Sequence, residues 1–214
     1  MEFGVITILT FLICYLIGSF PTGYLFVKAA HHKDLTKEGS GNVGTFNAIT
    51  VSGSKKLGIV VLFLDLIKGA LPVFLLTSVF NENILTVYIA SLFIVIGHNF
   101  PVWLKFKGGR GLATGAGIFL VLNYWIVIFW CVTWVVLMLF KRGVLMSNFY
   151  ATLFLPLFAI LLNSLGIRIT IHAVNTEGIN QFVVFVIFVS LLVIFRHTEV
   201  LIKIFPFTAK NLDK

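Results

Sequence analysis

Two glycine-rich segments carry residue types that could bind a phosphate or another anion. In the first, residues 39–44 read Gly-Ser-Gly-Asn-Val-Gly, so three glycines are combined with a hydroxyl and an amide. Closely spaced glycines let backbone N–H groups converge on one anion, and Ser40 and Asn42 would add side-chain donors. The spacing also fits a dinucleotide-binding fingerprint, but no β-strand precedes it and no βαβ unit can be drawn. Residues 39–44 are therefore either a phosphate-binding loop or a flexible connection between helices.

The second segment, residues 105–111, reads Lys-Phe-Lys-Gly-Gly-Arg-Gly and lies directly before a predicted helix. Backbone N–H groups at the start of a helix, the helix dipole and three cations all favour a bound phosphate. Cations at a membrane boundary can also anchor a protein to lipid headgroups. Since headgroup anchoring needs no glycine, the three glycines favour a phosphate-binding loop.

Two opposite charges, Asp65 and Lys68, lie three residues apart inside an apolar run, on one face of the predicted helix. An isolated charge near the centre of a bilayer costs about 2.5–3.5 kcal/mol on insertion scales, so both are expected to face protein and to pair. Structural pairing is the first interpretation of these residues, and a direct catalytic role is the second.

His197 follows the last apolar run, in the order Arg196-His197-Thr198-Glu199. A histidine at this boundary could act as a general base or hold a substrate hydroxyl. The alternative is a buried, hydrogen-bonded histidine with a structural role. The sequence has neither the Ser-His-Asp order of a nucleophilic triad nor a ligand spacing typical of a metal site.

The apolar composition indicates what kind of structural element positions these residues. The chain has 214 residues, of which 59% are hydrophobic and 11% are charged, and its mean hydropathy is +1.04. An average soluble domain has about 25% charged residues, so this chain lacks the polar side chains that would cover a soluble globule. The high hydrophobicity excludes a disordered chain as well. We therefore expect an all-α integral membrane protein that forms one domain over residues 1–214.

Apolar runs of the length needed to cross about 30 Å of hydrocarbon predict the membrane-spanning segments. Residues 111–140 form a run that is longer than a single crossing needs, and Asn123-Tyr124 could divide it. The other runs lie near residues 3–27, 57–79, 84–101, 146–163 and 180–195.

The distribution of charge decides between one crossing and two in residues 111–140. The chain has 16 Lys and Arg against eight Asp and Glu, and cationic loops are retained on the cytoplasmic side of a membrane. With a turn at Asn123, nearly all of the loop cations fall on one side, while Arg168 lies outside. This arrangement predicts seven segments, with the N-terminus out and the C-terminus in. The basic excess is thus interpreted as topology, with no nucleic-acid partner, and the site is expected in the cytoplasmic loops near residues 28–56 and 102–111.

Six short motifs, taken in order, resemble those of the bacterial acyl-phosphate:glycerol-3-phosphate acyltransferase family (PlsY). They extend from residue 18 to near residue 204 and so cover almost the whole chain. Six matches in the order of the family are far more specific than any single one. The motifs are Gly-Ser-Phe-Pro-Thr-Gly at residues 18–23, residues 39–44 with Asn47, Leu-Asp-Leu-Ile-Lys-Gly at residues 64–69, Gly97-His98 with Phe100-Pro101, Phe-Lys-Gly-Gly-Arg-Gly at residues 106–111, and His197 with Glu199.

The resemblance implies an integral membrane enzyme of bacterial phospholipid synthesis. Such an enzyme moves a fatty acyl group from acyl-phosphate to the 1-hydroxyl of glycerol 3-phosphate, and it releases lysophosphatidate and phosphate without a cofactor or a metal. Its partners would be these two substrates and membrane lipid. Its site would face the cytoplasm from the bacterial cell membrane.

The resemblance also implies roles for individual residues of this chain. Ser40 and His197 would be catalytic. The phosphates of the substrates would be bound by Gly39, Gly41, Asn42, Asn47, Lys107, Gly108, Gly109, Arg110 and Gly111. A supporting, structural role would fall to Asp65, Lys68, His98 and Glu199.

The chain departs from the usual family pattern within several of these motifs. Thr36 and Thr50 stand where the family usually has arginine, Arg110 replaces a lysine, and Val200 replaces the last asparagine. Each lost arginine could remove a bidentate phosphate contact. Two alternatives to full acyl transfer therefore stay open: a membrane protein that binds or transports an anionic lipid or phosphate ester, and a paralogue whose catalysis is weakened.

Overall fold

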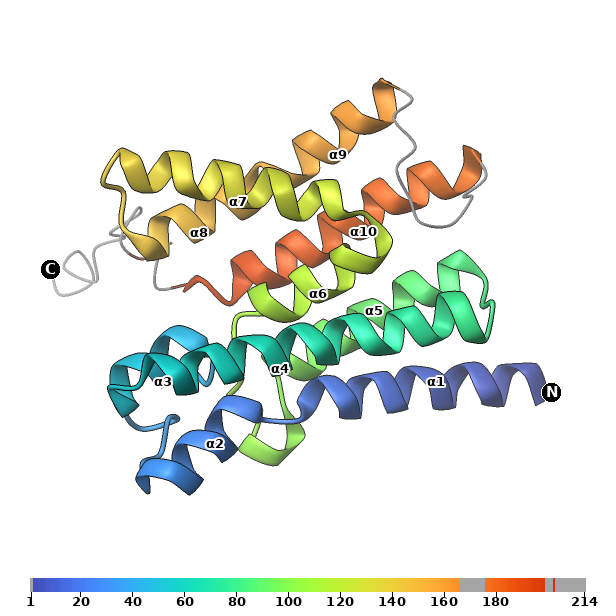
Figure 1. The fold of residues 1–214 in the computed structure, drawn as a ribbon. Helices are drawn as coiled ribbons and strands as arrows, with labels where there is room; N and C mark the ends of the chain where they lie inside the picture. Colours follow the sequence, from blue (N-terminus) through green and yellow to red (C-terminus); the bar gives the residue numbers. More distant parts are fainter. Residues whose placement is uncertain (1, 166–175, 199–201, 203–214) are drawn as a thin grey trace, which may run out of the picture.

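The computed structural model describes residues 2–165, 176–198 and 202, and the regular elements within them are helices. The helices run roughly along one direction, and α1 begins at the right-hand end of the view in Figure 1. The α-helices are α1 (Glu2–Ser19), α2 (Thr22–His31), α3 (Thr45–Ser52), α4 (Lys55–Phe74), α5 (Ile84–Asn99), α6 (Leu112–Leu122), α7 (Tyr124–Leu139), α8 (Val144–Leu153), α9 (Leu155–Ser164) and α10 (Thr176–Phe195). A π-helical turn, η1 (Leu75–Val79), extends α4, and a 3₁₀ turn, η2 (Val102–Leu104), follows α5.

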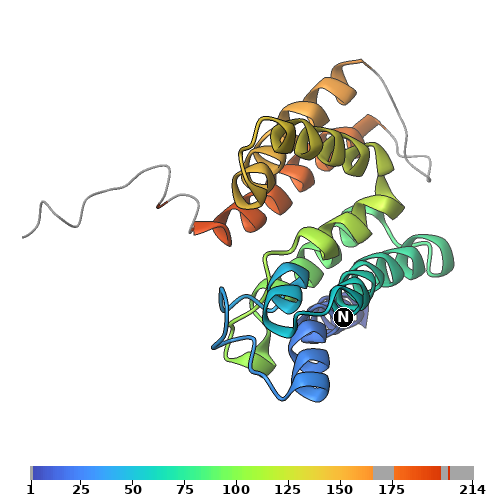
Figure 2. The ribbon, with the colours of Figure 1, turned by 60° about the vertical axis from the view of Figure 1, so that its left-hand side comes forward.

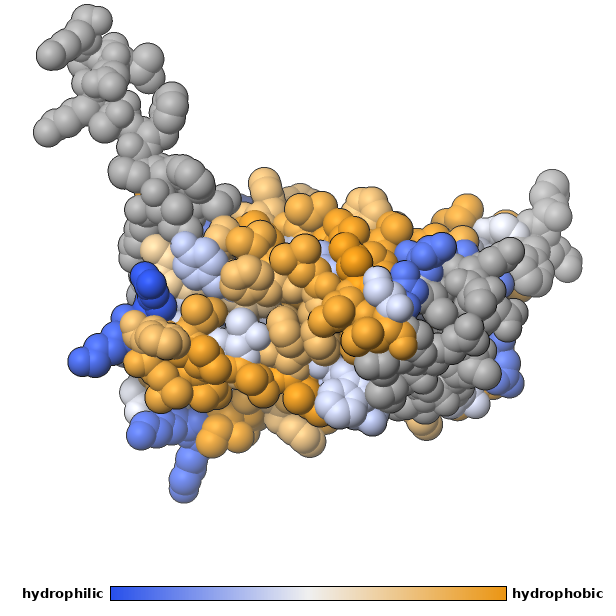
Figure 3. Space-filling view, turned by 90° about the horizontal axis from the view of Figure 1, so that it is seen from above, coloured by the Kyte–Doolittle hydropathy of each residue, from blue (hydrophilic) through white to orange (hydrophobic). Residues whose placement is uncertain are grey.

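The surface of these helices suits lipid. Large apolar side chains such as Ile8, Ile59 and Phe63 are more than 60% exposed. Figure 3 shows a broad apolar surface, with hydrophilic residues gathered toward its ends. Among the described residues, the helical stretches long and apolar enough to cross a membrane are Gly4–His31, Lys55–Val79, Ile84–Leu104 and Val144–Ser164, and shorter apolar helices lie at Leu112–Leu122, Tyr124–Leu139 and Asn180–Phe195. The prediction of an all-helical membrane protein is confirmed.

The predicted span over residues 3–27 corresponds to the candidate span Gly4–His31, which the structure divides between α1 and α2. Pro21 has no backbone N–H and disfavours a helical conformation in the residue before it, so α1 ends at Ser19. The Thr22 amide then donates to the Phe20 carbonyl at 3.0 Å, and α2 begins with a new direction. The break leaves polar backbone groups inside the apolar region, where other side chains can use them.

The predicted turn at Asn123 is present. Asn123 has an extended backbone (φ −161°), and its side-chain oxygen caps α7 by accepting from the Trp125 amide at 3.1 Å. The preceding helix α6 has 11 residues and is therefore only about 16 Å long, well short of a full crossing. Residues 111–140 thus form two helices that meet at a side-chain cap.

A further division lies within the predicted span over residues 146–163. The structure has two helices there, α8 and α9, which meet at Phe154. Pro156 stands in the first turn of α9, where its missing N–H is tolerated but where the preceding helix cannot continue without a lost hydrogen bond. The predicted span over residues 146–163 corresponds to the single candidate membrane span Val144–Ser164.

Glycines bring the central helices into close contact. A Cβ on Gly18 or Gly97 would collide with the facing backbone between α1 and α5, and Gly69 and Gly117 have the same relation between α4 and α6. Small residues at such crossings let membrane helices pack tightly where lipid offers no hydrophobic driving force. These contacts fix α1 against α5 and α4 against α6, and α4 and α5 carry Asp65, Lys68 and His98.

The connections that carry the two glycine-rich segments lie toward one end of the helices. In Figure 1 the α2–α3 and α5–α6 connections lie on the left-hand side of the molecule, as does the last turn of α10. Figure 2 shows α6 between the α1–α5 group and the α7–α10 group. The fold therefore brings residues from five or more helices toward one polar end of an apolar bundle.

Candidate active site

The first glycine-rich segment is an ordered loop organised around Asn47, at the start of α3. The Asn47 side chain is buried, and its Oδ1 accepts from the Ser40 amide at 2.9 Å. Its Nδ2 donates to the carbonyl oxygens of Leu35, Glu38 and Asn42 at 3.3, 3.0 and 2.8 Å. One buried amide thus holds four separate points of the loop, which identifies Asn47 as the residue that keeps the loop closed.

The glycines of this loop are needed for its backbone conformation. Gly39 and Gly41 have φ of +61° and +72°, a region that side chains other than glycine rarely adopt. The Asn42 Oδ1 accepts from the Gly44 amide at 2.7 Å, so this side chain also supports the turn. Ser40 is exposed at the surface of the loop. These hydrogen bonds show that residues 39–44 form an ordered loop and not a flexible connection.

The second glycine-rich segment wraps around His98, near the end of α5. The Gly109 amide donates to the His98 carbonyl at 3.0 Å, and a Cβ on Gly109 would overlap the His98 ring. Gly108 lies equally close to the backbone of residues 98 and 99, while Gly111 has a φ of +82°. Each glycine therefore permits either a close approach or a left-handed conformation that a larger residue would prevent.

The charged residues of this segment differ in exposure. Lys107 is exposed, Arg110 is half-buried, and the intervening Gly108 and Gly109 are buried. Lys105 and Phe106 both adopt positive φ, of +51° and +64°, directly before them. This reversal of the chain turns the loop back toward His98.

A residue that the sequence analysis did not assign to the site, Arg196, holds the same loop from α10. Its Nε donates to the Gly109 carbonyl at 3.1 Å, and its Nη2 donates to the Gly108 carbonyl at 3.0 Å. Its guanidinium carbon lies 5.3 Å from the centre of the Phe100 ring. The signal in the sequence was a cation at the very end of an apolar run, directly before His197.

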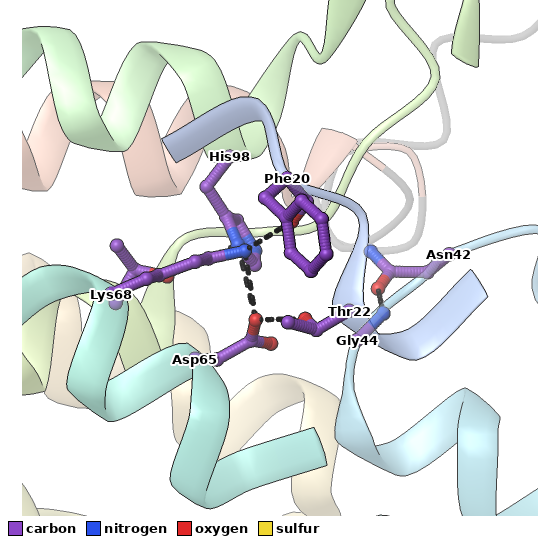
Figure 4. A network of polar contacts seen from close by, with 8 residues as sticks. Phe20, Thr22, Asn42, Gly44, Asp65, Lys68 and His98 are labelled. Atoms are coloured by element: carbon purple, nitrogen blue, oxygen red, sulfur yellow. Dashed lines mark hydrogen bonds and ion pairs between the residues drawn. The ribbon is translucent and has the colours of Figure 1, made fainter. Parts of the chain in front are cut away.

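A buried polar network lies beneath the loops (Figure 4). The predicted pair is confirmed, because Lys68 Nζ lies 2.8 Å from Asp65 Oδ1. The Thr22 hydroxyl donates to the same carboxylate oxygen, and Lys68 also donates to the Phe20 carbonyl at 3.1 Å. Neither Thr22 nor Phe20 was predicted here, although the proline between them was the available signal. The break between α1 and α2 is thus what supplies partners for the intramembrane charges.

His98 links this network to the second loop. Its Nδ1 lies 3.9 Å from Asp65 Oδ1 and 3.1 Å from the Thr114 hydroxyl of α6. Its carbonyl and ring face Gly109, as described above. His98 thus joins α5 to α4, α6 and the second loop.

His197 is fully buried, and its Nδ1 lies 2.7 Å from the Val193 carbonyl one turn earlier in α10. A carbonyl oxygen can only accept, so Nδ1 carries the proton of this contact. In the neutral ring Nε2 is then the nitrogen that can accept a proton. Glu199 and Val200, which follow it in the same motif, lie outside the described residues.

One departure from the family pattern has a clear local structure. The Thr36 hydroxyl and amide donate to the Asp34 carboxylate at 2.6 and 2.9 Å. The Thr36 hydroxyl is the main cause of a lowered pKa of the Asp34 carboxyl, and Lys37, 3.8 Å away, adds to it. Thr36 therefore stabilises a turn within the α2–α3 connection. The other departure, Thr50, is exposed and donates to the Phe46 carbonyl within α3.

An apolar cavity of about 420 Å³ adjoins the second loop. Gly111 lines one part of it, and the lining follows α6 to Phe119, a distance of about 12 Å along the helix. Val193 and Ser190 of α10 line the opposite side. A second recess of about 660 Å³ lies between α1 and α4 and includes Thr22 and Lys68 in its lining. The second loop thus adjoins, at Gly111, a space that suits a hydrocarbon chain.

Substituting Gly109 with alanine is expected to reduce stability, because the new methyl group would overlap the His98 ring. Overpacking of this kind typically costs about 1–3 kcal/mol. Thermal unfolding of the purified protein in detergent measures the effect. Gly4→Ala is the matched control, since nothing lies within 4 Å of a Cβ at that position. Equal unfolding temperatures for the two variants would contradict the close packing of the loop on His98.

The fold and the site together define a helical membrane protein with ordered, glycine-rich loops suited to phosphate. The model of the family described as glycerol-3-phosphate acyltransferase matches residues 8–206, and the chain belongs to this family. Glycerol-3-phosphate acyltransferase of Bartonella henselae is 40% identical over 154 residues, which cover 71% of this chain and 72% of the relative. That of Ehrlichia canis is 35% identical over 190 residues, which cover 89% of this chain and 90% of the relative.

Solved structures agree with this assignment. The chain is similar to the crystal structure of PlsY, an integral membrane glycerol 3-phosphate acyltransferase, in its glycerol 3-phosphate form, with a TM-score of 0.76 and 30% identity. The lysophosphatidic acid form of that protein gives a TM-score of 0.75 and 28% identity. Each comparison covers 92% of this chain and 91% of the other. The resemblance identified from the six motifs is confirmed.

Proposed function

We propose that this protein transfers a fatty acyl group from acyl-phosphate to the 1-hydroxyl of glycerol 3-phosphate in bacterial phospholipid synthesis. The observation that carries the proposal is the glycine loop at residues 108–111, which ends at Gly111 in the lining of an apolar cavity. A phosphate-binding loop beside a space for hydrocarbon is what an acyl-phosphate and a phosphorylated acceptor require together. Family membership and the two ligand-bound forms of the similar structure support the same reaction.

The reaction needs little beyond positioning and a proton acceptor. The acceptor hydroxyl oxygen attacks the acyl carbonyl carbon, a new ester C–O bond forms, and the bond between the acyl carbon and the phosphate oxygen breaks. We assign the hydroxyl proton to Nε2 of His197, from which it passes to the departing phosphate. The Ser40 hydroxyl would donate to a substrate phosphate, and Lys107 and Arg110 would supply charge to it. Phosphate is a good leaving group, so orientation of the two substrates supplies much of the acceleration.

The supporting residues have distinct tasks in this proposal. Asn47 and Asn42 were predicted to bind phosphate, and we instead assign them to holding the first loop in the conformation that presents Ser40. His98 and the pair of Asp65 with Lys68 hold the second loop on α4 and α5. The predicted contacts of Gly39, Gly108, Arg110 and Gly111 with phosphate would be made by their backbone N–H groups. The amides of Gly41 and Gly109 instead donate to the carbonyls of Glu38 and His98, so these two glycines shape the loops.

The acyl chain is assigned to the 420 Å³ cavity. Of the two apolar spaces, this one is lined both by Gly111 of the loop and by Val193, whose carbonyl contacts His197. Burial there stabilises the chain by about 0.8 kcal/mol per methylene. The donor can therefore be held by its hydrocarbon while its phosphate lies at the loop.

We further propose that seven segments cross or enter the membrane, with the N-terminus outside and the glycine loops in the cytoplasm of a bacterial cell. The support is the cationic character of the loops near residues 28–56 and 102–111. Single cysteines introduced at the exposed Lys37 and Lys107, on a background without Cys14 and Cys131, should react with an impermeant reagent only in inside-out vesicles. Labelling of either position in right-side-out vesicles contradicts the orientation.

Acyl transfer by the purified protein tests the reaction itself. Hexadecanoyl phosphate and glycerol 3-phosphate should give lysophosphatidate and phosphate in equal amounts. Ser40→Ala is expected to lower kcat/KM about tenfold, because it removes one hydrogen bond to a charged group and leaves the loop backbone in place. Ser78→Ala, near the far end of α4, is the control. Release of phosphate without lysophosphatidate would contradict acyl transfer, and unchanged activity of Ser40→Ala would contradict the site.

Substituting Gly115 with valine should shorten the acyl chain that the protein accepts. A Cβ at Gly115 would lie 3.8 Å from a Val189 methyl, so alanine fits and the further methyl groups of valine project into the cavity. We expect kcat/KM for a hexadecanoyl donor to fall about tenfold relative to an octanoyl donor. Gly4→Val, on the exposed surface of α1, is the control. An unchanged ratio for Gly115→Val would assign the chain to the recess between α1 and α4 instead.

A further inference from the structure

We propose that Arg196 is a positioning residue that aims the backbone of residues 108–111 at the phosphate of glycerol 3-phosphate; the inference rests on the function proposed above. Its Nε and Nη2 contact the carbonyl oxygens of Gly109 and Gly108 at 3.1 and 3.0 Å, across 87 and 88 positions of sequence. A planar guanidinium presents its donors in a rigid fork, so two such contacts set the direction of both carbonyls together.

The geometry of the peptide bond carries this constraint to the opposite side of the loop. A trans peptide points its C=O and the following N–H in opposite directions. The Gly109 N–H accordingly faces away from Arg196, where it donates to the His98 carbonyl at 3.0 Å. Arg196 also holds the Gly109 carbonyl. By the same rule, the Arg110 N–H therefore points away from Arg196. Arg196 thereby selects the side of the loop toward which the Arg110 amide points.

Two adjacent glycines need such a constraint more than other residues do. Gly108 and Gly109 have no Cβ, so their backbone has more accessible conformations than that of any other dipeptide. If the loop became ordered only when the substrate bound, the free-energy cost of ordering would weaken substrate binding. The clamp from α10 orders the loop before the substrate binds.

The guanidinium is itself held in place. It lies over the Phe100 ring at 5.3 Å, and Phe100 belongs to the same α5–α6 connection as the loop. Arg196 directly follows the end of α10. The guanidinium is therefore fixed beside the loop by a ring from the same connection.

Steady-state kinetics of Arg196→Gln and Arg196→Lys tests the proposal. The KM for glycerol 3-phosphate is expected to rise about tenfold in Arg196→Gln, while kcat and the KM for acyl-phosphate change by less than about threefold. Arg196→Lys should lie between this variant and the wild type, because an ammonium keeps the charge but loses the parallel contacts. Arg142→Gln, an exposed cation in the α7–α8 connection, is the matched control and should leave all three constants unchanged.

A second measurement does not depend on turnover. Glycerol 3-phosphate should raise the unfolding temperature of the wild type in detergent, and the same concentration should raise that of Arg196→Gln much less. If glycerol 3-phosphate raises the unfolding temperature of the wild type but no acyl group is transferred, the proposed reaction fails. The rise in unfolding temperature of the Arg196 variants then still tests the role of Arg196. The role is overturned if the wild type is not protected, if Arg196→Gln keeps the wild-type KM and protection, or if it loses activity toward both substrates only in proportion to the folded fraction.

Discussion

Replacing His197 with alanine is expected to lower kcat for acyl transfer about 100-fold or more. A positioned general base typically contributes a factor of this size. The structure supplies the physical reason, because the contact of Nδ1 with the Val193 carbonyl assigns the ring proton to Nδ1. Nε2 is then the nitrogen able to take the proton from the attacking hydroxyl. Initial rates at saturating concentrations of both substrates measure the effect.

The controls for His197 separate chemistry from folding. His31→Ala changes an exposed histidine of α2 and should leave kcat within about twofold of the wild type. Since His197 is fully buried, the unfolding temperature of His197→Ala and its protection by glycerol 3-phosphate are measured beside the rates. A folded variant that keeps substrate protection and full kcat would refute the assignment of the base.

Replacing Asp65 with leucine is expected to destabilise the protein by about 3–5 kcal/mol. Removal of one partner from a buried ion pair leaves an uncompensated charge, which is among the most costly single changes. Here the charge left behind is that of Lys68, whose remaining contact is the Phe20 carbonyl at 3.1 Å. The Thr22 hydroxyl would lose its acceptor as well. Unfolding in detergent, followed by circular dichroism, measures the loss.

The double variant Asp65→Leu, Lys68→Met distinguishes a lost charge partner from lost packing. Replacing a whole buried pair by apolar residues is often close to neutral, so most of the stability should return. Lys37→Met is the matched control, because Lys37 pairs with Asp34 at the same spacing but is 80% exposed, and it should change stability by less than about 1 kcal/mol. A double variant no more stable than Asp65→Leu would show that packing, and not the charge, is responsible.

The breaks in the helices illustrate the limit of hydropathy. Asn123 was predicted as a turn because the charges on either side had to lie on one side of the membrane. Pro21 and Phe154 lie inside runs whose hydropathy is continuous, and hydropathy measures composition and not backbone geometry. The consequence at Pro21 is chemical as well as structural, because the interrupted helix offers the Phe20 carbonyl and the Thr22 hydroxyl to the charges on α4.

Some features of the candidate site could be predicted from local sequence patterns, and others could be seen only in the folded chain. The glycine spacing of both loops and the i, i+3 spacing of Asp65 and Lys68 are local patterns, and each predicted the type of structure found. The task of Asn47 was not visible in the same way. Its amide serves carbonyls that lie five to twelve positions away, and only the closed path of the chain brings them together.

Composition and short-range spacing predicted the lipid-facing helices, the two loops and the buried charge pair, because each is a local property of the chain. The residues that contact these features from distant parts of the sequence became visible in the folded structure. Arg196 reaches the glycine loop, and His98 meets Asp65 and Thr114, because α5 packs against α4, α6 and α10. Contacts across tens of positions depend on how helices cross, and no local pattern encodes that geometry.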